Sequence, residues 1–140
     1  MPDLKTREIE LLTNAAVDAR DQAYAPHSHF YVGAALLMLD GEIITGCNVE
    51  NASYSLSLCA ERTAASAAVT AGHRSWRAVA IASVGGVAPC GACRQFLAEF
   101  GIDIDVVLID VIDGSRRVVK LSRLLPDAFT GSSLPSHSEL

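Results

Sequence analysis

Hydrophobic residues recur along this chain with two periods, one typical of helices and one typical of strands. Ile9, Leu12, Ala16 and Ala19 fall on one helical face and predict a helix over about 6–23. Short apolar segments beside tight turns indicate strands, and segments that end at glycine indicate helices. Strands are expected at 32–39, 43–47, 79–83, 105–109 and 118–120, and further helices at 59–71, 91–100 and, as one turn, 121–125.

The predicted elements follow one another in the order α-β-β-α-β-α-β-β. Helices that alternate with strands after an initial hairpin predict an α/β fold, in which a mixed sheet is covered by helices on both faces. The 140 residues are enough for one domain, which we assign to residues 1–130. Residues 131–140 are rich in Ser, Gly and Pro and are expected to form a loose tail.

Composition narrows the classes of partner. Half of the residues are hydrophobic, the formal net charge is −5, and no run of Lys and Arg occurs. A nucleic-acid polymer is therefore an unsuitable partner, and a small neutral ligand suits the charge better. No apolar run approaches the ~20 residues that span a bilayer, and the first residues have no signal-peptide character. We expect a cytoplasmic protein without membrane contact, whose four cysteines stay reduced and act as ligands or core residues.

Two short cysteine motifs carry the candidate chemistry, Cys59-Ala60-Glu61 and Pro89-Cys90-Gly91-Ala92-Cys93. Alone, the first is compatible with a small buried thiol and the second with a redox dithiol. Both motifs lie at predicted helix N-termini, so their three thiolates can meet at one point. A zinc ion with three protein ligands keeps its fourth position for water, which is the catalytic arrangement. Cys47 ends a strand and is expected to be a core thiol.

The charge of such a site needs compensation, because three thiolates outweigh one zinc ion. Helix N-termini carry partial positive charge, and Arg62 stands where its guanidinium can donate to the ligand sulfurs. Glu61 follows Cys59 by two residues and is the candidate general base and acid beside the metal. A first-turn glutamate is also favoured by the helix dipole alone, and the two roles are compatible.

Around these motifs the sequence resembles the small zinc-dependent cytidine deaminases over most of its length. The resemblance rests on Tyr24-Ala25-Pro26, Ser28-x-Phe30, Val32 to Leu36, Gly46 to Tyr54, Cys59 to Ala64, Pro89 to Gln95 and Leu124-Leu125-Pro126-x-x-Phe129. It implies a three-layer α/β/α fold with a mixed five-stranded sheet, one zinc ion per chain and a homotetramer. The implied activity is hydrolysis of cytidine or deoxycytidine to uridine or deoxyuridine and ammonia, in pyrimidine salvage.

The resemblance also implies a role for each matching residue. At the metal, Cys59, Cys90 and Cys93 match the zinc ligands and Glu61 matches the proton shuttle. Around the substrate, Asn48 and Glu50 match residues that bind the ribose, Phe30 matches an aromatic that packs against the pyrimidine, and Ala52 matches a backbone contact to the base. Phe129 matches an aromatic that reaches a neighbouring subunit's pocket. Independently, ribose hydroxyls need a carboxylate acceptor and an amide, which Glu50 and Asn48 supply. For Phe30, a place in the core is almost as good an interpretation.

Two other functions stay open at this point. A blasticidin-type deaminase shares both cysteine motifs, although the Asn48–Asn51 segment favours cytidine. A non-catalytic zinc-stabilised module is disfavoured by Glu61 and by the lack of a fourth ligand. His27, Tyr31, Ser55 and the short 84–88 loop depart from the family pattern and concern the pocket rim and the subunit contacts. His27 and His29 are expected to be exposed loop residues and not metal ligands.

Overall fold

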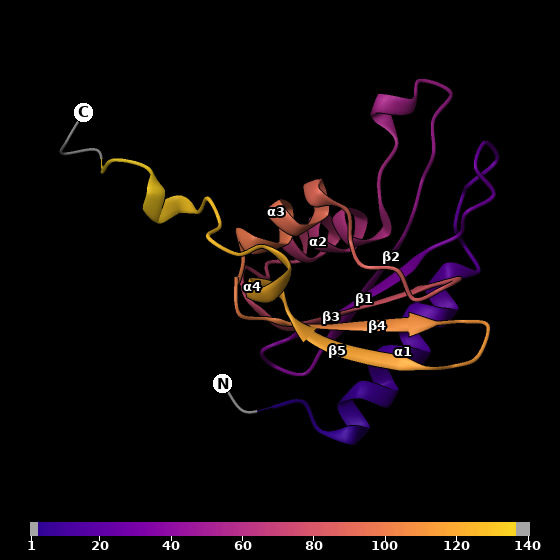
Figure 1. Ribbon diagram of the computed structural model, residues 1–140, viewed down its shortest axis with the longest axis horizontal. Coiled ribbons are helices and arrows are strands. Elements are labelled where there is room, and N and C mark those ends of the chain that lie inside the picture. The colour runs from indigo at the N-terminus through magenta and orange to yellow at the C-terminus, as the bar shows by residue number, and fades with distance from the viewer. Residues whose placement is uncertain (1–2, 137–140) are drawn as a thin grey trace.

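The computed structural model describes residues 3–136, which form one layered α/β arrangement. The helices are α1 (Thr6–Arg20), α2 (Ala60–Thr70), α3 (Gly91–Ala98) and α4 (Leu121–Leu124), with 3-10 turns at Tyr54–Leu56 and Gly131–Ser133. The strands are β1 (Gly33–Met38), β2 (Ile43–Cys47), β3 (Trp76–Ser83), β4 (Asp105–Asp110) and β5 (Arg116–Lys120). Helices α2 and α3 lie on one side of the sheet and α1 lies on the other (Figure 1).

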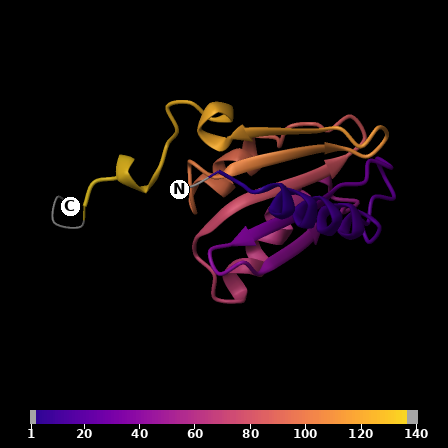
Figure 2. The ribbon, with the colours of Figure 1, turned by 90° about the horizontal axis from the view of Figure 1, so that it is seen from below.

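The strands form a single sheet in the order β2-β1-β3-β4-β5. Strand β1 pairs antiparallel with both β2 and β3, and β4 pairs antiparallel with β5. Only β3 and β4 run parallel, with Ile81 opposite Leu108, and α3 lies on the crossover between them. The view from below shows α1 lying along the sheet, with the strands behind it (Figure 2). The predicted mixed sheet with helices on both faces is therefore confirmed.

The central strands are buried on both faces, which explains their continuous apolar composition. In β3, Val79 and Ile81 belong to the core beneath α2 and α3, whereas Ala78, Ala80 and Ala82 belong to the core beneath α1. Alanines on the α1 side allow a close approach. A Cβ added at Gly33 would lie 2.0 Å from the Ala16 carbonyl oxygen, so this position in β1 accepts only glycine.

The alanine-rich helix α2 packs closely on its own sheet. Its buried side chains Ala60, Ala64, Ala65 and Ala68 all belong to the core. A Cβ added at Gly46 in β2 would lie 2.4 Å from the Ala64 backbone nitrogen. The small residues of α2 are therefore explained by contact with β2 and need no second subunit.

Several element boundaries differ from the predicted ones. Helix α1 ends at Arg20, because Asp21 and Gln22 turn the chain through bonds to the carbonyls of Asp18 and Ala19. Strand β3 begins at Trp76, three residues before the prediction, because the strand continues pairing with β1 as far as Met38. Strand β5 begins at Arg116, two residues before the prediction.

The segment expected to form a loose tail, residues 131–140, is described as far as residue 136. Gly131–Ser133 forms a 3-10 turn, and residues 137–140 lie outside the described residues. The assignment of residues 1–130 to a single catalytic domain stays a prediction. Within residues 3–136, no helix has the length and apolar character that a membrane crossing requires.

Candidate active site

Two helix N-termini meet at one end of the sheet and bring the cysteine motifs together. Cys59 is the N-cap residue of α2, and Cys90 is the N-cap residue of α3. Each cap carbonyl accepts the first helical hydrogen bond, from Thr63 N at 3.1 Å and from Arg94 N at 3.0 Å. The cap geometry places both thiols at the positive ends of helix dipoles, where a thiolate is stabilised.

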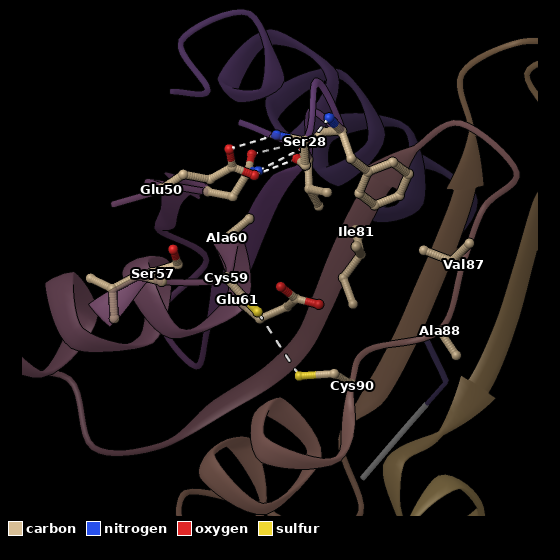
Figure 3. A pocket seen from close by; sticks show the side chains of 14 residues that line it. Ser28, Glu50, Ser57, Cys59, Ala60, Glu61, Ile81, Val87, Ala88 and Cys90 are labelled. Atoms are coloured by element: carbon tan, nitrogen blue, oxygen red, sulfur yellow. Dashed lines mark hydrogen bonds between the residues drawn. The ribbon is translucent and has the colours of Figure 1, made fainter. Parts of the chain in front are cut away.

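The three predicted ligand sulfurs have the spacing that zinc requires. The Sγ atoms of Cys59, Cys90 and Cys93 all lie within 4.8 Å of one another. Cys59 Sγ and Cys90 Sγ are 3.9 Å apart and face each other (Figure 3). Two sulfurs on a tetrahedral zinc ion, each at about 2.3 Å, are separated by about 3.8 Å. The donor set therefore fits a tetrahedral zinc ion with one position left open.

Neighbouring groups favour the thiolate form of Cys59, whereas the hydrogen bond with Cys59 raises the pKa of Cys93. A hydrogen bond from Cys93, and then the nearby Arg62, lowers the pKa of Cys59 below its usual range. Arg62 Nη2 donates to Cys59 Sγ at 3.5 Å, and this contact raises the pKa of the guanidinium. Arg62 thus contacts one of the candidate ligand sulfurs, and its role at a metal site stays a prediction. Cys47 lies at the end of β2 outside the cluster, and it is half-buried instead of fully buried.

Glu61 lies in the first turn of α2, beside the cysteine cluster. Its side chain points into the pocket (Figure 3), and the residue is 5% exposed. Burial, followed in effect by the negative charge of Cys59, raises the pKa of Glu61 to about 7. A carboxyl group of this kind is able both to accept and to donate a proton near neutral pH.

The pocket in front of the cluster has a volume of about 320 Å³, enough for a small heterocyclic ligand. One end contains Cys59, Cys90 and Glu61. The other end is polar, with Ser28, Asn48 and Glu50, and the walls between the ends are apolar, with Phe30, Val32, Ile81, Val87 and Ala88. A ligand in this pocket would thus contact the cysteine cluster at one end (the metal end), apolar walls in the middle and hydrogen-bonding groups at the other end (the polar end).

Asn48 connects this pocket to the strand beside it. Its Oδ1 accepts from Val32 N at 2.9 Å, and its Nδ2 donates to the Phe30 carbonyl at 2.7 Å. The amide thus fixes the backbone on both sides of Tyr31, directly after Phe30, and one Nδ2 proton remains for a ligand. Phe30 is 40% exposed and lines the pocket, so the interpretation of Phe30 as a core residue is wrong.

Glu50 is held by the segment that precedes Phe30. Its Oε1 accepts from His27 N at 2.9 Å and from Ser28 N at 3.0 Å. Its Oε2 accepts a short hydrogen bond from the Ser28 hydroxyl. The hydrogen bond with this hydroxyl is the main reason that the pKa of Glu50 lies below its usual range. The carboxylate is therefore ionised and oriented at neutral pH.

Two predicted site residues lie away from the pocket of this chain. Ala52 is exposed and does not line the cavity. Phe129 is 59% exposed, and its carbonyl accepts from Gln95 Nε2 at 2.8 Å at the surface of α3. Ser28 lines the pocket and bonds to Glu50, a position that the sequence did not single out. The Ser28-x-Phe30 motif was the available signal, but no local pattern connects Ser28 to a glutamate 22 residues later.

Other side chains of types that can bind metals lie outside the cysteine cluster. His27 and His29 are exposed, as expected, and neither belongs to a potential metal-binding cluster within residues 3–136. Asp40, Glu42 and His73 also lie close to one another, outside the pocket. There, His73 Nε2 and Glu42 Oε2 are joined by a 2.9 Å hydrogen bond, which is sufficient to explain the grouping.

Comparisons with known proteins agree with this geometry. Residues 6–109 match the family model described as the cytidine and deoxycytidylate deaminase zinc-binding region. The chain is 45% identical to the cytidine deaminase of Sporosarcina psychrophila, over 94% of this chain and 98% of that protein. It is also 45% identical to the cytidine deaminase of Mycobacterium tuberculosis, over 96% of this chain and 97% of that protein. The crystal structure of the Burkholderia pseudomallei cytidine deaminase superposes with a TM-score of 0.82 at 50% identity, covering 86% of this chain and 98% of that one.

Proposed function

Because this chain belongs to the zinc-binding family of cytidine and deoxycytidylate deaminases, we propose that it hydrolyses the C4 amino group of cytidine or deoxycytidine. Water and the nucleoside give uridine or deoxyuridine and ammonia. The observation that carries the proposal is the pocket itself, which has a three-thiol metal cluster and a buried carboxyl group at one end. Its other end offers Glu50 and Asn48 to a sugar, and the apolar walls between the two ends offer a place for a pyrimidine.

Each residue of the metal end has a separate task. Cys59, Cys90 and Cys93 would hold the zinc ion, which when bound would supply Lewis-acid activation of water at neutral pH. Glu61 accepts the proton of the attacking water, at a position shielded from solvent. It delivers this proton to N3 of the ring. It then takes the remaining proton of the hydroxyl added at C4 and passes it to the departing amino nitrogen, so that the two protons of the water end on N3 and on ammonia. Arg62 stabilises the Cys59 thiolate.

A nucleoside suits the pocket better than a nucleotide. The described residues that line the pocket and its outer extension include no Lys or Arg. Glu50 is ionised at the polar end, and it would repel a phosphate group. Although the family model covers both cytidine and deoxycytidylate deaminases, the charge of this site favours the uncharged nucleosides.

An ammonia-release assay tests this function directly. The enzyme is supplied with cytidine, deoxycytidine, deoxycytidylate and blasticidin S in parallel. We expect turnover of both nucleosides, much slower turnover of the nucleotide, and loss of activity after zinc is removed by a chelator and dialysis. A zinc-loaded protein that releases ammonia only from blasticidin S, or from none of the four, would contradict the proposal.

Assembly and cellular role extend the same proposal. We assign the chain to a cytoplasmic homotetramer that serves pyrimidine salvage and takes neither nucleic-acid polymers nor membranes as partners. Exposed aromatic side chains support association, since Tyr54 is 75% exposed and Phe129 is 59% exposed. Phe129 would reach a neighbour's pocket, and Ala52 would meet the base through its backbone. Phe129→Ala should then raise the KM for cytidine, and a fully active monomer in light scattering would contradict composite sites.

A further inference from the structure

Ser28 joins Glu50, at the polar end of the pocket, to the backbone of Phe30, on its apolar wall. We infer that Ser28 is a positioning residue, whose hydroxyl orients the Glu50 carboxylate so that one acceptor position is presented to a sugar hydroxyl. The inference rests on the proposed function, because it assumes that the ligand at this end is a ribose or deoxyribose. Figure 3 shows Ser28 beside Glu50, across the pocket from the cysteines.

The Ser28 hydroxyl has a fixed direction. Its oxygen accepts from Phe30 N at 3.0 Å, and its single proton is donated to Glu50 Oε2. A serine hydroxyl has one proton, so this proton is unavailable to any other acceptor while the bond to Glu50 persists. One hydroxyl thus links the backbone of Phe30, at the apolar wall, to the carboxylate at the polar end.

Counting acceptor positions shows what the arrangement leaves for a substrate. An ionised carboxylate has two oxygens with about four acceptor positions in all. The backbone N–H groups of His27 and Ser28 occupy Oε1, and the Ser28 hydroxyl occupies one position on Oε2. One position on Oε2 remains. Without the hydroxyl, Oε2 has no protein donor among the described residues, and the carboxylate is held at Oε1 only.

The experiment compares two substrates and a double mutant. Kinetic constants are measured for wild type, Ser28→Ala, Ser28→Thr, Glu50→Ala and the Ser28→Ala/Glu50→Ala double variant. Cytidine is compared with 2′,3′-dideoxycytidine, which lacks both ring hydroxyls. The ratio of kcat/KM for the two substrates is taken within each variant, so that the fraction of folded or zinc-loaded enzyme cancels. Ser66→Ala, a change at an exposed serine of α2, serves as the matched control.

We expect Ser28→Ala to reduce the cytidine-to-dideoxycytidine ratio about 10-fold, through the KM for cytidine, because a hydrogen bond to a charged group is affected. Ser28→Thr keeps the hydroxyl and should restore most of the ratio. In the Glu50→Ala background, Ser28→Ala should change the ratio less than twofold, since its effect passes through Glu50.

Three results would overturn the inference. An unchanged ratio in Ser28→Ala would show that the hydroxyl does not orient Glu50. An equal loss of kcat/KM on both substrates would show that the Ser28 hydroxyl acts on Phe30 or on the metal end and not on the sugar. A further loss in the Glu50→Ala background would show that Ser28 acts on the sugar by another route. Failure of the proposed function looks different, because wild type would then release no ammonia from either substrate.

Discussion

Replacing Gly46 by alanine would test how closely α2 must pack on β2 to form the metal cluster. A Cβ at this position would meet Ala64 N at 2.4 Å, Ala60 O at 2.8 Å and Ala64 Cα at 2.9 Å. All three contacts are with the backbone of α2, so no side-chain rotation relieves them. Ordinary van der Waals contact begins at 3.4 Å, and the helix and the strand must therefore separate by about 1 Å.

This displacement has two consequences of different size. Overpacking of this kind costs about 1–3 kcal/mol of folding free energy. For a chain of this length, each kcal/mol lowers the melting temperature by roughly 3–5 °C.

The second consequence is a change in the geometry of the metal cluster. Cys59 is the N-cap of α2 and Cys90 the N-cap of α3, so movement of α2 alone changes their 3.9 Å separation. Metal–ligand distances tolerate only about 0.2 Å, and zinc affinity should fall at least about tenfold.

The assay combines thermal unfolding with zinc competition against a chromophoric chelator. Gly131→Ala is the control, because a Cβ at Gly131 has no heavy atom within 4 Å. We expect a lower melting temperature and weaker zinc binding for Gly46→Ala, and no change for Gly131→Ala. Unchanged melting and zinc binding would refute the close packing. Lower melting with unchanged zinc affinity would refute the second step, and would show that the edge strand β2 moves while α2 stays in place.

Three further predictions concern single side chains. Glu61→Gln should retain zinc and lower kcat by about 10²–10⁴-fold, and near-normal turnover of zinc-loaded enzyme would assign proton transfer to another group. Cys90→Ala should lose zinc and activity together, and elemental analysis that finds a full zinc content would contradict its role as a ligand. Glu8 forms an ion pair with Arg77, and a hydrogen bond from the Lys5 backbone and the contact with Arg77 lower the pKa of Glu8. Glu8→Gln should therefore reduce the free energy of unfolding by about 0.2–1 kcal/mol at pH 7. The lowered pKa makes this contribution fully present above the unfolded value of 4.5. The difference from wild type should therefore shrink as the pH falls below 4.5 and vanish once the pH is below the lowered folded-state pKa of Glu8.

The order of elements was predictable because most elements have a turn or stop signal beside them. Asp40-Gly41 and Asp113-Gly114 stand at the turns of the two hairpins, and Gly41 and Gly114 have positive φ angles. The beginning of β3 has no such signal. Trp76 is buried by pairing with β1, and Arg77 is balanced by Glu8, 69 residues earlier in the chain. A strand that begins with a tryptophan followed by an arginine shows no apolar strand pattern until its tertiary partners are known.

The candidate site divides in the same way. Cys59, Glu61 and the C-x-x-C motif are recognisable because their chemistry is contained in a few adjacent residues. The polar end is assembled from residues that are far apart in sequence. Asn48 bonds to the backbone of Phe30 and Glu50 to Ser28, across 18 and 22 residues. Hydrogen bonds of this range leave no periodicity, so Asn48 and Glu50 were found through the family resemblance, and the hydrogen-bonding needs of ribose then supported that choice.

The two ends of the pocket therefore differ in what holds them. The metal end depends on two helix N-termini that are packed on a sheet buried on both faces. The polar end depends on two loops that are joined by short backbone pairing, in which Tyr24 N donates to Asn48 O and Glu50 N donates to Tyr24 O, both at 2.9 Å. Because those loops have exposed side chains and few core contacts, they are expected to open locally at a lower free energy than α2 or α3. Such opening would admit the nucleoside without disturbing the thiol cluster. Changes in the loops should then act mainly on KM, whereas changes at the two helix caps should act on kcat and zinc content together.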